Sequence, residues 1–219
     1  MKPEQLPFDL GYRAAYERED FWVSGSNSAA VSWIDKWPKW PAPALVIYGP
    51  VACGKTHLSR VWEKKSGALS LKAGEIGIIP EEANAVIIDD VDSVIGVRQS
   101  EESLFHLYNS FMEKGGHFLL IASRAPIEWP FVLADLKSRI LASPSVVMGS
   151  PDDHLMAVVL AKLFSDRQIF VPQEVISFIL TRIERSFAAL RDIVDKIDHK
   201  ALAEKRAVTI PLVRDILRK

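Results

Sequence analysis

The stretch from Gly49 to Leu58, GPVACGKTHL, decides how the core of the protein folds. It matches the phosphate-loop pattern G-x-x-x-x-G-K-[ST], whose fixed positions fall at Gly49, Gly54, Lys55 and Thr56. The apolar run ALVIY precedes the pattern and a helix-compatible segment follows it, as the motif requires. Backbone N–H groups of such a loop surround a β-phosphate, while Lys55 binds phosphate oxygens and the Thr56 hydroxyl binds Mg²⁺. The pattern therefore predicts a nucleotide site, but it does not distinguish a motor from a kinase or a switch.

A second motif, AVIIDDVD, begins at Ala85 and ends a hydrophobic strand in acidic residues. Parallel-sheet topology can place the carboxyl end of this strand beside the phosphate loop. Asp89 is then expected to hold Mg²⁺ through water, and Asp90 to orient or deprotonate a hydrolytic water. Two aspartates after a strand more often form a solvated turn, and only the phosphate loop favours the metal-site interpretation.

Apolar runs of strand length alternate with helix-length segments through the first two thirds of the chain. Strands are expected at 44–48, 85–88, 118–122 and 145–148, with a weaker one at 68–71, and helices at 55–65 and 101–114. Alternating strands and helices imply crossover connections, so the fold class is α/β with a parallel sheet in a three-layer αβα core. The Pro/Trp-rich segment 36–43 is expected to be an irregular connection.

After Met148 the pattern becomes helical. Ser150 is expected as an N-cap with Pro151 at the first helical position, and later helices are expected to open at Pro172, after Ser186, and at Thr209 and Pro211. Apolar residues at steps of three and four predict that these helices share a core. Residues 149–219 are therefore predicted to form a separate helical bundle.

The composition limits the classes of function. The 219 residues carry a net charge of −1, without the basic excess that is typical of a nucleic-acid binder. The single cysteine, Cys53, excludes an internal disulfide framework and suits a reducing compartment, and within the loop it is expected to act simply as a small residue. No apolar run has signal-peptide or membrane-span length, so a cytoplasmic protein without a membrane partner is expected. The histidines show no metal-ligand spacing.

Four segments carry a resemblance to a known family. They are FWVSGSNSAA at 21–30, LVIYGPVACGKTHL at 45–58, LADLKSRI at 133–140 and VTIPLVRDIL at 208–217. Together with the acidic strand end they resemble the AAA+ ATPases of the bacterial replication initiator (DnaA) group. The resemblance implies a P-loop AAA+ core at 13–148 and an all-helical lid at 149–219, with ADP or ATP and Mg²⁺ as cofactors.

The same resemblance implies the site residues. Cofactor-binding positions are expected at Val23, Asn27, Gly49, Pro50, Val51, Ala52, Cys53, Gly54, Lys55, Thr56, His57 and Arg191, with Gly25 also in a matching place. Arg139, in the segment LKSRI, matches the arginine finger, which stabilises charge on the γ-phosphate of a neighbouring subunit. An exposed arginine near a helix end is the alternative.

The amino-terminal residues 1–12 are expected to be a docking tail. The segment QLPFDL, Gln5 to Leu10, is similar to the short peptide by which replication proteins dock on the sliding clamp. An extended tail can place the Gln5 amide on backbone groups while Leu6, Phe8 and Leu10 enter apolar pockets. The alternative is a tail that packs on its own domain.

The end of the chain adds an expectation about DNA. Initiators continue past the lid into a domain that reads origin DNA, whereas this chain stops at Lys219, so no sequence-specific DNA binding is expected. The combination resembles regulators of the group that bind a nucleotide, dock on the clamp and stimulate ATP hydrolysis by the initiator.

Two departures from the family pattern bear on hydrolysis. The lid arginine that senses nucleotide aligns with Ala188, and Arg191 lies one turn further on, where it can substitute. The polar sensor after the strand at 118–122 falls at Ser123 and Arg124. Weak intrinsic hydrolysis is therefore expected, with the loop holding ADP as a switch and keeping Arg139 available. The alternative function is an autonomous ATPase of the helicase-loader or clamp-loader type, and a metabolite kinase is disfavoured. The sequence does not decide whether the protein forms a homo-oligomer.

Overall fold

The structure is a computed structural model that describes residues 22–76, 82–204 and 206–217. The core elements are α1 (Ser28–Lys36), β1 (Ala44–Tyr48), α2 (Lys55–Ser66), β2 (Leu69–Lys72), η1 (Ala73–Glu75), β3 (Ala85–Asp89), η2 (Val91–Ser93), α3 (Arg98–Lys114), β4 (His117–Ala122), η3 (Pro126–Glu128), α4 (Ala134–Ala142) and β5 (Ser145–Val147). The remaining helices are α5 (Asp153–Asp166), α6 (Gln173–Leu180), α7 (Phe187–Glu204) and α8 (Ile210–Leu217).

Five parallel strands form one sheet in the order β2-β3-β4-β1-β5. Strand β1 lies between β4 and β5, with Ala44 opposite Phe118 and Val46 opposite Ser145. Strands β1, β3 and β4 are almost wholly buried, which is why they read as continuous apolar runs rather than alternating ones. The carboxyl ends of β1 and β3 consequently reach the same edge of the sheet, where the phosphate loop begins.

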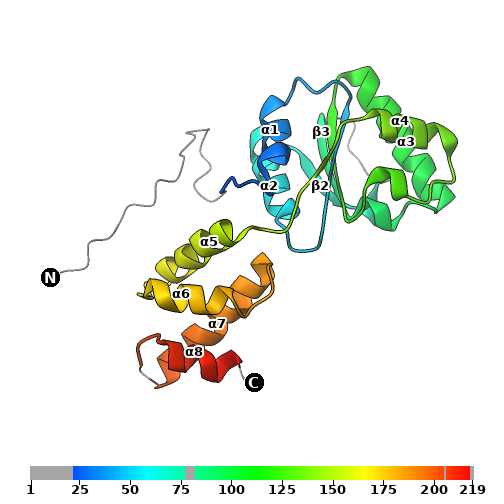
Figure 1. Cartoon of the computed structure of the whole chain (residues 1–219). Helices are drawn as coiled ribbons and strands as arrows, with labels where there is room; N and C mark the ends of the chain where they lie inside the picture. The colour runs from blue at the N-terminus through cyan, green and yellow to red at the C-terminus, as the bar shows by residue number, and fades with distance from the viewer. Residues whose placement is uncertain (1–21, 77–81, 205, 218–219) are drawn as a thin grey trace.

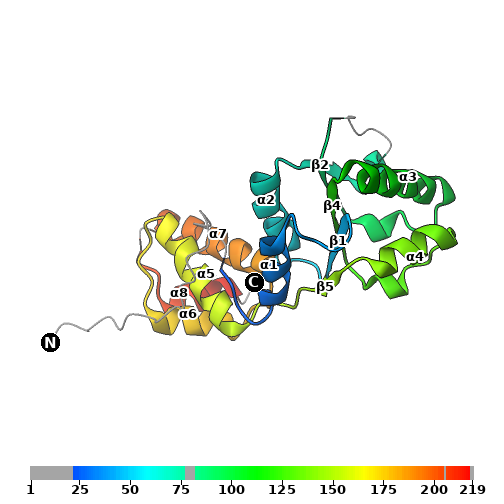
Figure 2. The ribbon, with the colours of Figure 1, turned by 90° about the horizontal axis from the view of Figure 1, so that it is seen from above.

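Helices cover both faces of the sheet. Figure 2 shows α1 and α2 on one face and α3 and α4 on the other. Each face has its own buried cluster: one contains Trp62 of α2, and the other contains Phe118 of β4. The predicted α/β fold with a three-layer core and a parallel sheet is confirmed.

Helices α5 to α8 form a separate bundle beside α1 and α2 (Figure 1). Its core contains Phe164, Ile179, Leu190 and Leu212, one from each helix. The expected helical lid is confirmed, while the domain limits at residues 12, 13, 148 and 149 stay predictions. Among the described residues, no helix combines the length and apolar content that a membrane crossing needs.

The predicted start of the first lid helix was wrong by a few residues. Asp152, rather than Ser150, is the N-cap of α5, and its Oδ1 accepts a hydrogen bond from the Leu155 N–H at 2.7 Å. A carboxylate at this position also complements the positive end of the helix dipole. Pro151 lies before the helix, and Pro172 likewise occupies the N-cap of α6 rather than its first turn.

Candidate functional site

The phosphate loop joins β1 to α2 and starts at a glycine that no other residue can replace without rearrangement. A Cβ atom on Gly49 would lie 2.0 Å from the Met148 carbonyl oxygen. Gly54 has φ of 105°, in the left-handed region that favours glycine, and it directly precedes the first turn of α2. The loop therefore curls over the start of α2, so that the backbone N–H groups of the first turn are available to an anion.

Lys55 lies inside this loop and is 9% exposed. Its Nζ donates to the carbonyl oxygens of Gly49 and Pro50, both at 2.7 Å, and lies 4.0 Å from Cys53 Sγ. An ammonium group has three donors, and the two short bonds fix its position while the third direction holds only the long contact to sulfur. The loop thus orients a cation that retains capacity for a further acceptor. Burial raises the pKa of the Cys53 thiol, against the opposing effect of the Lys55 charge.

Thr56 and Asp89 come together, as expected. The Thr56 hydroxyl donates to Asp89 Oδ2 at 3.3 Å, which connects the start of α2 to the end of β3. Two oxygen donors at this spacing fit a Mg²⁺ ion that takes its other ligands from water and phosphate. Within the described ranges, no set of three or more His, Cys, Asp or Glu residues could hold a metal ion by itself.

Asp90 follows directly and is exposed, with φ of 58°. Its backbone N–H donates to Asp89 Oδ1 at 3.0 Å, so the neighbouring carboxylate is held by both Thr56 and Asp90. The Asp90 side chain is not part of the cavity lining described below. Its predicted role toward a hydrolytic water stays a prediction.

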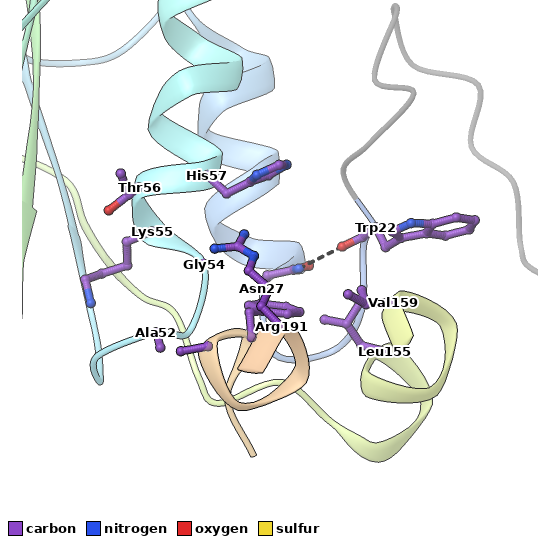
Figure 3. Close-up of a pocket in the computed structure, with 12 residues that line it drawn as sticks. Trp22, Asn27, Ala52, Gly54, Lys55, Thr56, His57, Leu155, Val159 and Arg191 are labelled. Carbon is purple, nitrogen blue, oxygen red and sulfur yellow. Dashed lines mark hydrogen bonds between the residues drawn. The ribbon is translucent and has the colours of Figure 1, made fainter. Parts of the chain in front are cut away.

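A cavity of about 260 Å³ lies between the phosphate loop, α1 and the lid (Figure 3). Its lining contains these predicted positions: Asn27, Ala52, Gly54, Lys55, Thr56, His57 and Arg191. Ala188, with which the resemblance aligns the family's lid arginine, lines it as well. It also contains four residues that were not predicted as site residues: Trp22, Leu155, Val159 and Phe187. Trp22 falls within the segment 21–30 that carries the family resemblance. Leu155, Val159 and Phe187 come from lid helices that only the fold brings to the loop, so no local pattern marks these three as site residues.

Several predicted cofactor positions lie outside the lining. Val23 is 55% exposed and Val51 is 82% exposed. Gly49, Pro50 and Cys53 do not line the cavity either. They contact the Lys55 ammonium, so they affect the site only through the position of that group.

Asn27 is buried and uses its amide within the chain. Its Oδ1 accepts from the Ser24 N–H at 2.9 Å, and its Nδ2 donates to the Trp22 carbonyl at 2.9 Å. The side chain therefore fixes the segment that leads into α1 and holds Trp22 at the cavity wall (Figure 3). We expect Asn27 to shape the site rather than to read a ligand with its own amide.

The lid contacts the phosphate loop directly. The Phe187 N–H, at the start of α7, donates to the Ala52 carbonyl at 3.3 Å. A Cβ atom on Gly54 would lie 3.1 Å from the Phe187 ring, so the glycine also makes room for the lid. A hydrogen bond and a packing contact thus join the phosphate loop to the lid at the wall of the cavity.

Arg191 enters the cavity from the same lid helix, one turn beyond Ala188. Figure 3 shows it reaching from α7 toward His57 on α2. Burial lowers the pKa of His57, and the charges of Arg191, Arg60 and Lys64 lower it further. The imidazole is therefore held toward its neutral form beside the Arg191 guanidinium, whose charge favours an anionic ligand in this part of the cavity.

Asp92, the last residue of the acidic motif, is a buried carboxylate for which the sequence predicted no role. It accepts from the backbone N–H groups of Ser123, at 3.1 and 3.2 Å, and Arg124, at 3.2 Å. Arg124 Nε also lies 3.7 Å from Asp92. The expected polar sensor segment is thus anchored to η2 through its backbone, and neither sensor side chain lines the cavity.

Arg139 lies on α4, which covers the sheet face opposite α1 and α2 (Figure 2). It is absent from the cavity lining. The predicted clamp-docking residues Gln5, Leu6, Phe8 and Leu10 lie outside the described residues.

Comparisons with known proteins agree with this geometry. The family model "Hda, lid domain" matches residues 153–217, and "Bacterial DnaA ATPase domain" matches residues 79–145. An uncharacterized protein of Haemophilus influenzae is 29% identical over 188 residues, which cover 80% of this chain and 81% of the relative.

Two solved structures share the fold. Domain III of the Thermotoga maritima replication initiation protein DnaA superposes with a TM-score of 0.77 at 20% identity, over 90% of this chain and 93% of that one. AMPPCP-bound DnaA from Aquifex aeolicus gives a TM-score of 0.72 at 19% identity, over 84% of this chain and 65% of that one. The two family matches, the AAA+ fold and the helical lid lead to one conclusion: the chain is a DnaA/Hda-like AAA+ protein.

Proposed function

We propose that the protein is a nucleotide-bound regulator of replication initiation that stimulates ATP hydrolysis by the initiator DnaA. In this proposal the amino-terminal tail docks on the DNA sliding clamp through Gln5, Leu6, Phe8 and Leu10. The observation that carries the proposal is the position of Arg139, on the sheet face opposite the chain's own nucleotide cavity. A cation placed there is suited to the nucleotide of a neighbouring molecule rather than to its own.

The cavity is the nucleotide site of the proposal. The phosphate loop and its oriented Lys55 ammonium suit the β-phosphate of ADP or ATP, and the Aquifex aeolicus relative holds AMPPCP. Thr56 and Asp89 would hold Mg²⁺, which when bound supplies positive charge to the phosphate oxygens. Lid residue Arg191 adds a second cation at the cavity wall. These contacts support retention of nucleotide, with the lid closed over it.

Stimulation in trans follows from the chemistry of phosphoryl transfer. Negative charge spreads over the γ-phosphoryl oxygens in the transition state, and an added arginine stabilises that charge by about a thousandfold or more in rate. At the chain's own site the resemblance aligns the family's lid arginine with Ala188, which lines the cavity, and this supports weak intrinsic hydrolysis. The nucleotide then serves to hold the fold that presents Arg139.

The test is single-turnover hydrolysis by ATP-loaded DnaA with clamp loaded on DNA. Wild-type protein should accelerate conversion to ADP, and Arg139→Ala should abolish that acceleration while still binding nucleotide and clamp. Arg139→Lys should rescue poorly because lysine lacks the planar fork of donors. Leu202→Ala, which truncates an apolar side chain that is 70% exposed on the lid, is the matched control. Full stimulation by Arg139→Ala would refute the proposal.

The clamp contact is tested separately, by binding and co-elution with the clamp. Gln5→Ala combined with Leu6→Ala should abolish clamp binding and leave nucleotide binding unchanged. Co-elution of this double variant with clamp would show that the tail is not the tether.

An autonomous ATPase of the remodeller type is the second candidate, favoured by the Thr56–Asp89 pair and the oriented Lys55. Steady-state hydrolysis by the protein alone separates the two. Turnover without DnaA at the rate of the stimulated reaction would support the second candidate.

A further inference from the structure

The side chain of Arg139 does not extend freely into solvent but rests on α3. Its guanidinium carbon lies 5.4 Å from the ring centroid of Tyr108 and 5.8 Å from that of Phe105. One terminal nitrogen also lies 3.3 Å from the sulfur of Met112. Both ring distances are within the range of a cation–π contact, so three residues on one helix hold the cation. We call Phe105, Tyr108 and Met112 the Arg139 seat.

The backbone of Arg139 is held by the same region. The Ser143 hydroxyl donates to the Arg139 carbonyl at 2.9 Å, and it lies 3.4 Å from the Tyr108 hydroxyl. Tyr108 is 5% exposed, so its ring has a fixed position in the core. One buried tyrosine therefore contacts both the guanidinium and, through Ser143, the end of the helix that carries it.

The other end of α4 is fixed as well. Glu101 on α3 is fully buried and accepts from the N–H groups of Val132 and Leu133, the residues that lead into α4. Helix α4 is thus tied to α3 on both sides of Arg139. A hollow between these two helices and the segment 41–43 leaves Arg139 accessible from outside.

We propose that the Arg139 seat consists of positioning residues that restrict the guanidinium to an orientation ready for a phosphate of a partner molecule. The partner is the nucleotide-bearing edge of DnaA, so this part rests on the proposed function. A free arginine loses rotamer freedom when it binds, and a side chain already held in place loses less. In the proposed function the guanidinium stabilises charge that develops only in the transition state, so the seat should raise the rate at saturation rather than the affinity for the partner.

The first test needs no partner. The order parameter of the Arg139 Nε–Hε vector, measured by ¹⁵N relaxation and assigned by its disappearance in Arg139→Lys, reports ps–ns motion of the guanidinium. We expect an ordered signal in wild type and a clearly more mobile one in Phe105→Leu/Met112→Ala. This double variant removes two of the three contacts and leaves the buried Tyr108 in place. Leu202→Ala should match wild type, and an equally mobile signal in wild type and the double variant would overturn the seat.

The second test measures function. At saturating concentration, Phe105→Leu/Met112→Ala should stimulate ATP hydrolysis by DnaA about two- to fivefold less than wild type, at an unchanged half-saturating concentration. An unchanged maximal rate, or a change in half-saturating concentration alone, would contradict positioning. Failure of Arg139→Ala to lower stimulation would refute the proposed function instead, while the order parameter still decides whether the seat exists.

Discussion

The two faces of the sheet hold their cations in different ways. On the face of α1, α2 and the lid, Lys55 is fixed by two backbone carbonyls of a loop that only glycine at position 49 permits. On the face of α3 and α4, Arg139 is held by the side chains of Phe105, Tyr108 and Met112. A site built from backbone depends on whether the chain can take a particular path, whereas a site built from side chains depends on their identity. A single substitution should therefore abolish binding at the backbone-built site, whereas substitutions at the side-chain-built site should each reduce its function in part.

The largest effect should come from Gly49→Ala. The added methyl would lie 2.0 Å from the Met148 carbonyl oxygen, so β5 or the loop must move. We expect loss of nucleotide binding and destabilisation by about 3 kcal/mol or more in urea unfolding. Gly74→Ala is the control, because a Cβ atom there would meet no atom of the described residues within 4 Å. Equal stability of the two variants would show that the loop is not constrained by its backbone.

Glu101→Ala tests whether the α3–α4 face depends on side chains. It removes the acceptor for the N–H groups of Gly96, Val132 and Leu133. Buried donors without partners are costly, so we expect destabilisation by about 3 kcal/mol, with a smaller loss for Glu101→Gln. The control is Glu102→Ala, which breaks only an exposed ion pair with Arg98 and should cost at most about 0.5 kcal/mol. A neutral Glu101→Ala would mean that this face does not need its side-chain connections.

Lys55→Ala should leave the fold intact and weaken nucleotide binding. Charge-assisted hydrogen bonds contribute about 1.5 to 3 kcal/mol, so calorimetry should record an affinity about 10- to 150-fold lower. Lys64→Ala, on the same helix but outside the cavity lining, is the matched control and should change affinity much less. Unchanged affinity in Lys55→Ala would break the link between the loop and the proposed nucleotide.

The same contrast explains what the sequence could predict. The phosphate loop, the strand that precedes Asp89 and the parallel sheet of the core depend on local patterns, and they were predicted, whereas the order of the strands was not. Phe187 and Leu155 reach the cavity only when the lid folds against the loop, so no local pattern marks them as site residues. Asp92 and Glu101 look like ordinary surface acids, and only the fold reveals that they bind backbone N–H groups. Their burial depends on contacts far apart in the chain.

The smallest expected effect is a pH dependence of stability that arises on the α1–α2 side. His117 at the start of β4 packs edge-on against Trp37 and Trp40, with ring centroids 6.1 and 5.6 Å away. Burial lowers the pKa of His117 from its ordinary value of 6.5, although a hydrogen bond to the Pro38 carbonyl opposes the shift. The unfolded chain therefore takes up a proton more readily than the folded one. Stability should be complete above pH 6.5 and should fall as the pH drops through 6.5 toward the lower folded-state pKa.

Urea unfolding at about pH 7.5 and about pH 5.5 measures this loss. His57 contributes in the same direction, so the wild type alone cannot assign the effect. His117→Gln should lose less stability between the two pH values than wild type, while His154→Gln, which replaces an exposed histidine on α5, should lose as much as wild type. An identical loss in wild type and His117→Gln would show that the tryptophan contacts do not hold this imidazole in its neutral form. The α1–α2 side would then depend on its backbone-built loop and apolar packing, without a titrating side chain at this position.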